Sequence, residues 1–493
     1  MVSSRGVTLV ASFVFARLLQ PSAYATASLV ITLAGTVALL APSAISDLLV
    51  SEANLRSLRI DRCWIASLAS GIVTALFVIA LIPLSSRFYG EESQLTIPLA
   101  LLAVRSVLES VSIVPFSKLR LALRFREIAL VEATSIFLGT TIGIGSAALG
   151  GGAIALLLVL VASTGLRSLL LLWTARSAVD AGTNVSAPGS RWKWIIAGAG
   201  QYIHALLSRL DILMISVVCS RDILGYYAWA IALAFQAQAL IVAQLGAILQ
   251  PVLAMLETDR DRQAAAHRRV CRMVMCLGVP AACIQAAVAG PFIRLIFSDR
   301  WSPAIPIFVV LSLHMALGIN AASVMAMMKA RGLFRELLVW QGVQLLVSAI
   351  VFSVLASSGY DISQHIACTV FGPAAAGEGI PLAIGTCNGL LWAISISIAR
   401  WRILGEPATR NDLARGAIVW GSAIGVCVTV FVLEVAISNT VSQPLTDAIL
   451  LFIVAPVAYV LAVAAGSRGD PRLSEDLSSV VLLVRRRLPK KFR

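Results

Sequence analysis

The sequence predicts an all-α polytopic membrane protein with about fourteen transmembrane helices, arranged as two parallel six-helix repeats followed by two further helices. Three observations predict this fold class: the apolar composition, the alternation of basic loops along the chain, and two short strings that recur. Of 493 residues, 59% are hydrophobic and only 13% are charged. A soluble domain carries about twice that charged fraction. We therefore expect the chain to lie almost entirely within a bilayer.

Apolar segments of near-spanning length follow one another along the chain. A helix needs about 20 apolar residues to cross the hydrocarbon core. The first apolar stretch ends near Arg17 and Pro21 rather than at a small-residue cleavage site, so no cleavable signal peptide is predicted. The expected spans are residues 2–19, 24–50, 63–84, 96–116, 128–148, 152–175, 194–219, 224–250, 270–297, 303–328, 335–357, 379–399, 414–437 and 445–466.

Basic residues alternate between the loops. Those after even-numbered spans, together with the tail, hold most of the 39 lysines and arginines, whereas loops after odd-numbered spans hold little beyond Arg87, Arg221 and Arg300. Loops rich in Lys and Arg stay in the cytoplasm. The pattern predicts a multi-pass protein of the cell inner (cytoplasmic) membrane with both termini cytoplasmic. It also accounts for the net charge of +14 without a nucleic-acid partner.

Two strings occur twice at the same place in this predicted topology. Phe-Arg-Glu at residues 125–127 recurs at 334–336, and Tyr-Ala-Thr-Ala at 24–27 is echoed by Tyr-Ala-Trp-Ala at 227–230. The spacing between copies is similar, and the charge pattern places the first pair inside and the second pair outside. Parallel repeats of this kind are typical of transporters, whose substrate path lies between the two halves.

The repeat sets the predicted domain boundaries. Two segments of the chain have open interpretations: an insert at residues 360–377 is an outer loop or a short re-entrant turn, and the basic tail is an amphipathic helix on anionic headgroups or a disordered topogenic segment. We expect transport to need the last two spans least, since they lie outside the repeat. The domains are residues 1–175 and 176–400, one six-helix bundle each, 401–466 with two additional helices, and the cytoplasmic tail 467–493.

Ionisable residues inside the predicted spans are the first functional candidates, because an unpaired charge at bilayer depth is costly. Arg105 and Glu109 are four residues apart on one helix face and can pair with each other. They either line a cavity or pack their helix as a self-neutralised pair. Arg167 has no acid nearby on its own helix, so it needs a partner from elsewhere or an anionic ligand.

His204, Ser208 and Asp211 fall on one predicted helical stripe, while Arg209 points elsewhere. Three polar groups on an apolar helix predict a cavity lining, since buried polar groups need partners or water. Isolated polar groups in other spans have simpler interpretations. Glu132 and Lys329 are expected to reach headgroups, His314 and Glu434 to lie in the core, and Asn320 and Asn388 to bond neighbouring helices.

Enzyme chemistry has no support in the sequence. There is no phosphate-binding Gly-x-x-x-x-Gly-Lys-Ser/Thr loop, no Gly-x-Ser-x-Gly turn and no His-Glu-x-x-His. The eight cysteines lie mostly in apolar segments without metal-ligand spacing and are interpreted as core residues. We predict no catalytic residue, no metal and no cofactor, so uphill transport would run on ion gradients or substrate supply.

Three segments resemble a known family. The segment at 15–25, which contains Ala-Arg-Leu-Leu-x-Pro-x-x-Tyr, is similar to the opening of the oligosaccharide flippases. Residues 123–132 are similar to that family's loop and fifth-helix entry. The element Ser208–Asp211 followed by Leu224–Ala228 resembles the one after the family's seventh helix. These flippases belong to the multidrug/oligosaccharidyl-lipid/polysaccharide (MOP) exporter superfamily. Ala25, where glycine is usual, and a shorter opening depart from the pattern.

The resemblance implies two helical bundles around a cavity that opens alternately to either face. It implies an undecaprenyl-pyrophosphate-linked oligosaccharide as substrate, with a polysaccharide polymerase and chain-length machinery as partners. Arg105, Arg167 and Arg209 are the intramembrane arginines available for the pyrophosphate, because guanidinium groups suit phosphate oxygens. Glu109, His204 and Asp211 are the candidates for coupling transport to protons or Na⁺, with Ser208 as a further polar cavity group.

Two alternatives stay open. A cation-coupled multidrug exporter of the same superfamily would favour acidic over basic cavity residues, which the intramembrane arginines oppose. An O-antigen polymerase or ligase also spans the membrane many times and uses undecaprenyl-linked substrates. Such enzymes resemble one another in having a large outer loop with catalytic basic residues, whereas the longest outer loop here carries only Asp361 as a formal charge.

Overall fold

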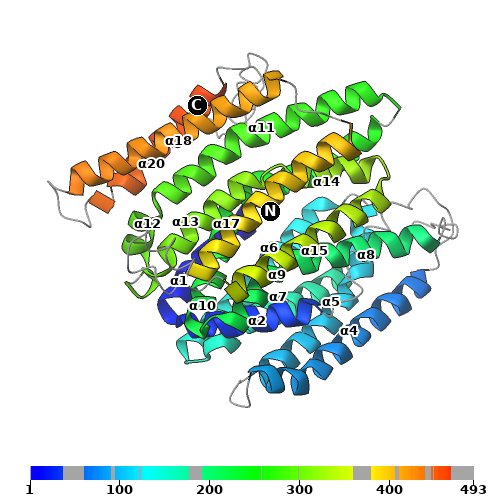
Figure 1. The fold of residues 1–493 in the computed structure, drawn as a ribbon. Helices are drawn as coiled ribbons and strands as arrows, with labels where there is room; N and C mark the ends of the chain where they lie inside the picture. Colours follow the sequence, from blue (N-terminus) through cyan, green and yellow to red (C-terminus); the bar gives the residue numbers. More distant parts are fainter. Residues whose placement is uncertain are drawn as a thin grey trace, which may run out of the picture. The chain divides into compact units, whose positions relative to one another are not determined.

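The chain is almost entirely helical in the computed structural model, in agreement with the predicted fold class (Figure 1). The structure describes residues 2–36, 60–89, 95–121, 124–176, 191–256, 258–297, 299–358, 379–405, 410–438, 446–447 and 449–467. It divides into two compact units, residues 1–229 with 338–361 and residues 230–337 with 362–493. This division cuts two helices and differs in kind from the predicted repeat boundaries, which stay a prediction.

The first unit contains the helices of the first half of the sequence and most of one later helix, α15. Its helices are α1 (Val2–Leu18), α2 (Pro21–Thr36), α4 (Ile60–Tyr89), α5 (Thr96–Leu121), α6 (Phe125–Ala148), α7 (Gly152–Ala175), α8 (Arg191–Leu207), α9 (Leu210–Val218), the start of α10 (Arg221–Met255) and most of α15 (Phe334–Ser358).

The second unit contains the larger part of α10, the start of α15 and the remaining helices. They are α11 (Arg260–Ala287), α12 (Ala289–Ile296), η1 (Asp299–Trp301), α13 (Ala304–Leu317), α14 (Ala321–Ala330), α17 (Gly379–Ile398), the π-helical turn η3 (Ala399–Ile403), α18 (Arg410–Ser438), the π-helical turn η4 (Leu450–Val454) and α20 (Ala455–Ser467).

Short apolar contacts hold the first unit together. Helix α7 packs between α5 and α6, α4 packs on α5, and α1 packs on α6. Helix α2 touches α4, α5, α7, α8 and α9, which makes it the most widely connected helix of this unit. Buried Phe15 and Ala155 belong to a core cluster of α1, α6 and α7. The tight turn between α6 and α7 uses Gly150 and Gly152 at φ +83° and +50°, where a side chain would be strained.

Helix α11 is the centre of the second unit and lies alongside α13, α18 and α20 (Figure 1). Val274 and Val279 of α11 form one core cluster with Val419 of α18, and Val430 with Ala458 belongs to a second cluster. The last two predicted spans are therefore built into the core of this unit.

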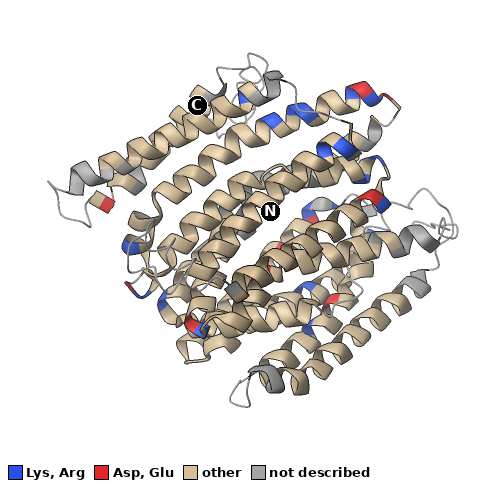
Figure 2. Cartoon of the chain, in the orientation of Figure 1, with Lys and Arg blue, Asp and Glu red and all other residues tan. Residues whose placement is uncertain are grey.

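Length and hydropathy support a membrane location. Within the described residues, nine helices are long and apolar enough to cross a membrane, and three shorter apolar helices accompany them. Charged residues are sparse along the helices and gather toward helix ends (Figure 2). Large apolar side chains such as Ile65, Leu76 and Leu346 are more than half exposed, as expected of faces that contact lipid. The number fourteen stays a prediction.

Three expected spans are interrupted. The segments 194–219, 270–297 and 303–328 were each predicted as one helix, and each contains two, with breaks at Ser208–Arg209, at Val288 and at Gly318–Asn320. Hydropathy does not register such breaks, because the flanking residues stay apolar.

Both copies of the Phe-Arg-Glu string start a helix. Phe125 opens α6 and Phe334 opens α15, with Glu127 and Glu336 in the respective first turns. A carboxylate in the first turn is favoured by the partial positive charge of the helix amino terminus. The insert at 360–377 and the tail after Ser467 lie outside the described residues.

Candidate functional site

Arg105 and Glu109 form the predicted pair on α5. Their Nη2 and Oε2 atoms are 3.6 Å apart, and Arg105 Nε also donates to the hydroxyl of Thr164 on α7 at 3.4 Å. Their side chains are 31% and 35% exposed. The pair is therefore only partly buried, and its contacts hold it in place. A ligand could reach it. Pairing is confirmed, whereas a cavity role stays open.

Arg167 finds its partner on a different helix. Its Nη2 lies 3.4 Å from Oε1 of Glu132 on α6, and its guanidinium lies over the ring of Phe116 at 4.9 Å. Such an ion pair with a ring contact lowers the cost of holding a charge at bilayer depth. Glu132 was expected to reach the headgroups, and in the structure it binds Arg167 instead. Sequence spacing could not reveal this pair, because it joins two helices.

Arg209 lies at the break between α8 and α9. Its backbone has φ −129° and ψ −3°, outside the helical range, and its Nη1 donates to the carbonyl oxygen of Ile31 on α2. Two turns of chain earlier, the hydroxyl of Tyr202 on α8 donates to the carbonyl of Thr36, also on α2, at 2.7 Å. The α8–α9 segment thus holds α2 by two backbone carbonyls near its described carboxyl end.

Gly35 makes room for the Arg209 guanidinium. A Cβ atom at this position would collide with Nη1, Cζ and Nε of Arg209, which are the three nearest atoms to it. The sequence did not predict a role for Gly35 or Tyr202, because neither carries a charge and their role depends on the packing of the α8–α9 segment against α2.

The predicted stripe of His204, Ser208 and Asp211 does not form one helical face. Because the helix breaks at Ser208–Arg209, spacing across the break no longer sets the direction of the side chains. Ser208 is exposed and donates to the Ala205 carbonyl at 3.0 Å. His204 is half-buried on α8. The expectation of a continuous stripe was therefore wrong, because the helix is interrupted at Ser208 and Arg209.

Asp211 is a buried carboxylate with its own partners. It is 3% exposed, and its two oxygens accept from the Tyr227 hydroxyl at 2.7 Å and from the Ile212 backbone N–H at 2.8 Å. Tyr227 is fully buried near the start of α10. Two residues before it, Gly225 meets the Pro21 backbone so closely that a Cβ would collide with the Pro21 carbonyl. The Leu-Gly-x-Tyr string therefore docks α10 onto both α9 and α2.

The three arginines of this region are matched in number by three carboxylates, but not every arginine is paired with one. Glu109 pairs with Arg105 and Glu132 with Arg167, while Asp211 is bonded to Tyr227. Within the described residues, Arg209 has a backbone oxygen as its acceptor and no carboxylate. A guanidinium held by a neutral oxygen is the one in this region that can pair with an anion without giving up a carboxylate partner.

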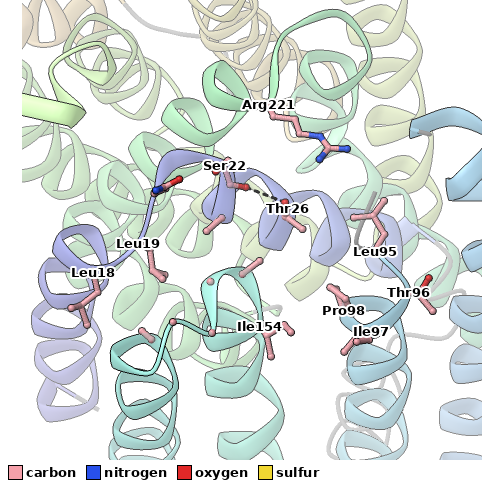
Figure 3. Close-up of a pocket in the computed structure, with 17 residues that line it drawn as sticks. Leu18, Leu19, Ser22, Thr26, Leu95, Thr96, Ile97, Pro98, Ile154 and Arg221 are labelled. Carbon is pink, nitrogen blue, oxygen red and sulfur yellow. Dashed lines mark hydrogen bonds between the residues drawn. The ribbon is translucent and has the colours of Figure 1, made fainter. Parts of the chain in front are cut away.

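A cavity of about 820 Å³ lies in the same unit (Figure 3). The α1–α2 turn, the start of α5 and the α6–α7 turn line it, with Ser22, Thr26 and Thr96 as hydroxyl groups. Arg221 at the start of α10 is its charged lining residue. The three intramembrane arginines are not among its described lining residues.

Polar contacts in the second unit are structural in character. Gln263 is fully buried, donates to the Leu253 carbonyl at 2.8 Å and accepts from Arg331 Nε at 3.0 Å. Arg294 of α12 pairs with the buried Asp447 at 3.2 Å. These contacts join segments far apart in sequence. Within the part of the chain that the structure describes, no group of three His, Cys, Asp or Glu residues is arranged to hold a metal ion.

Comparison with known proteins identifies the family. The family model described as polysaccharide biosynthesis protein matches residues 14–306, more than half of the chain. The chain belongs to this polysaccharide biosynthesis protein family. The match includes all the intramembrane arginines of the candidate site and supports the predicted resemblance. A search of curated proteins gives no match.

Two solved structures of membrane transporters share the fold of this family member. The lipid II flippase MurJ in an inward closed conformation is similar at a TM-score of 0.62 and 14% identity, over 94% of this chain and 97% of that chain. An inward-facing multidrug resistance MATE family transporter of the MOP superfamily is similar at a TM-score of 0.59 and 16% identity, over 81% and 94%. At these identities the likeness shows the fold, and the predicted MOP-type fold is confirmed.

Proposed function

We propose that this protein flips undecaprenyl-pyrophosphate-linked oligosaccharide repeat units across the cytoplasmic membrane by alternating access, for the biosynthesis of surface polysaccharides such as lipopolysaccharide O-antigen or exopolysaccharide. Family membership and the flippase-like fold support the class. The observation that carries the substrate is the partner of the Arg209 guanidinium. Among the described residues it is a carbonyl oxygen and no carboxylate, whereas Arg105 and Arg167 are paired with Glu109 and Glu132.

A pyrophosphate matches this arrangement chemically. It carries more than one negative charge, and its oxygens accept parallel bonds from a guanidinium fork. Arg209 would bind it most readily, because its present acceptor is an uncharged carbonyl. Arg105 and Arg167 would contribute by exchanging part of their contact with Glu109 and Glu132. The polyprenyl chain would stay in the bilayer during transfer.

Coupling to an ion gradient is the second part of the proposal. Glu109 is the strongest candidate, because it is partly exposed and its charge balances Arg105. Protonation of Glu109 would release Arg105 toward the phosphate. His204 and Asp211 are retained as candidates, with Ser208 as a polar neighbour, although Asp211 is committed to Tyr227 in this conformation. Protons and Na⁺ both suit a carboxylate.

The setting follows from the charge pattern. We place the protein in the inner membrane with both termini cytoplasmic, where lipid-linked repeat units are assembled, and a polysaccharide polymerase with its chain-length machinery would take the product on the outer face. No cofactor enters this scheme. The substrate path would lie between the two halves of the predicted repeat.

The competing function is multidrug export, favoured by the fold of the MATE transporter. Organic cations need carboxylates, and Glu109, Glu132 and Asp211, the described intramembrane carboxylates of the candidate site, are already paired with arginine or tyrosine. A polymerase or ligase is the third candidate. The two similar solved structures are a lipid II flippase and a multidrug transporter, which favours transport over catalysis.

Alanine substitutions test the proposal. Arg105→Ala, Arg167→Ala and Arg209→Ala should each abolish export of surface glycan while membrane levels of the protein stay normal. Full export by all three single variants would overturn the cationic site. Resistance to cationic dyes, measured in the same cells, would instead support the multidrug exporter. Neighbouring genes for glycosyltransferases and a polymerase would favour the flippase further.

A further inference from the structure

We propose that α2 provides a resting position for the Arg209 guanidinium, on the Ile31 carbonyl beside Gly35, and that the guanidinium leaves this position for a phosphate oxygen of the substrate. Gly35 is thereby a positioning residue that sets both the affinity for the substrate and the ease of its release. The inference rests on the proposed function, because it takes the incoming anion to be the substrate pyrophosphate.

The geometry of the resting position is specific. Arg209 Nη1 donates to the Ile31 carbonyl, and the guanidinium occupies the space that a side chain at Gly35 would need. Arg209 lies at a helix break, and its backbone dihedral angles are outside the helical range. A side chain on such a segment can change direction without moving a packed helix. Tyr202 holds the same stretch of α2 separately, through the Thr36 carbonyl.

Charge favours the exchange. A carbonyl is a neutral acceptor, whereas a phosphate oxygen is ionised, so the cationic guanidinium gains an attraction to phosphate that the carbonyl cannot offer. The Ile31 carbonyl therefore holds the guanidinium while the site is empty and yields it when phosphate arrives.

Release of the substrate uses the same contact in reverse. When the phosphate moves toward the outer face, the Ile31 carbonyl competes with it for the Arg209 guanidinium. This competition favours dissociation of the guanidinium from the phosphate. Helix α2 also packs on α5 and α7, which carry Arg105 and Arg167. A change in the contact between α2 and Arg209 can therefore alter the positions of the other two arginines. The resting position thus lowers the affinity for the substrate and raises the rate of its release.

Gly35→Ala is the informative variant, with Gly145→Ala as its matched control. A methyl group at Gly35 displaces the far end of a flexible side chain, so the fold should tolerate it. A Cβ at Gly145, on α6, meets nothing within 4 Å. Both changes replace a helical glycine by alanine, and the intrinsic gain in helix propensity is the same. Only the first evicts the guanidinium.

The first measurement needs no ligand. Purified protein is treated with phenylglyoxal, an arginine reagent, and modification of Arg209 is followed by mass spectrometry. Gly35→Ala should raise the modification of Arg209 severalfold over wild type, and Gly145→Ala should leave it unchanged. Equal modification in all three proteins would overturn the resting position, whatever the substrate is.

The second measurement uses undecaprenyl pyrophosphate as the probe, bound to protein in nanodiscs. Gly35→Ala should bind it up to about tenfold more tightly, because the competing hydrogen bond to a charged group is lost and the competent state is more populated. Glycan export should have a lower maximal rate. In an Arg209→Ala background, which is expected neither to bind nor to export, Gly35→Ala should leave the thermal unfolding midpoint unchanged, since the colliding group is absent.

The outcomes separate the two proposals. If wild type fails to bind the probe while Gly35→Ala still exposes Arg209 to phenylglyoxal, the resting position stands and the pyrophosphate substrate falls. If wild type binds and Arg209→Ala does not, yet Gly35→Ala binds like Gly145→Ala, the substrate stands and the exchange falls. Weaker binding by Gly35→Ala than by Gly145→Ala would show a structural role and overturn the exchange as well.

Discussion

Replacing Tyr227 by phenylalanine removes one buried hydroxyl and leaves its ring in place. Tyr227 is fully buried and Asp211 is 3% exposed, so no water is expected to replace the 2.7 Å bond between them. Asp211 then still accepts a hydrogen bond from the Ile212 N–H. A hydrogen bond to a carboxylate contributes about 1.5–3 kcal/mol, and a buried group left unsatisfied costs about 1–3 kcal/mol. We expect a loss of about 2 kcal/mol.

Thermal unfolding of the purified protein in detergent measures this loss. The matched control is Tyr459→Phe, because the Tyr459 hydroxyl donates to the Leu277 carbonyl at 3.4 Å, a long and weak bond. Tyr227→Phe should lower the unfolding midpoint clearly more than the control. In a double-mutant cycle with Asp211→Asn, the two changes should be non-additive. Equal midpoints for the two phenylalanine variants would refute the reasoning.

Two further predictions concern contacts between helices of the first unit. Gly225→Ala should reduce the amount of folded protein, because its methyl group meets the Pro21 backbone and cannot be moved aside cheaply, whereas Gly198→Ala should be tolerated in open space; membrane levels on immunoblots compare them. Glu132→Gln should lower export and stability by leaving Arg167 without its carboxylate, and Glu132→Gln with Arg167→Gln should recover stability but not export. Recovery of export by the double variant would contradict a substrate role for Arg167.

The sequence predicted the helices well where composition alone decides them. The span expected at 152–175 is α7, and the one expected at 128–148 lies within α6. Such segments are bounded by charged or glycine-rich turns. In a bilayer an apolar segment must make its backbone hydrogen bonds internally, which it does as a helix. The pair of Arg105 and Glu109 was predictable for a related reason, because both residues lie on the same helix four positions apart.

What the sequence could not predict depends on contacts between helices. The break at Arg209 interrupts an apolar run without a proline or a glycine, and the displaced guanidinium is received by a carbonyl of another helix. Arg167 and Glu132 lie on different helices, and so do Asp211 and Tyr227. A pattern within one segment carries no information on such partners. The predicted polar stripe was wrong because the segment that carries it breaks at Ser208–Arg209.

Translocation in a defined system tests the central claim most directly. Proteoliposomes are loaded with undecaprenyl-pyrophosphate-linked oligosaccharide that carries a radiolabelled sugar, and the fraction reached by an added lectin is followed with time. Wild-type protein should make the lipid-linked sugar accessible, and the variant with Arg105, Arg167 and Arg209 all replaced by alanine should do no better than protein-free liposomes. Translocation by that triple variant at the wild-type rate would contradict the account.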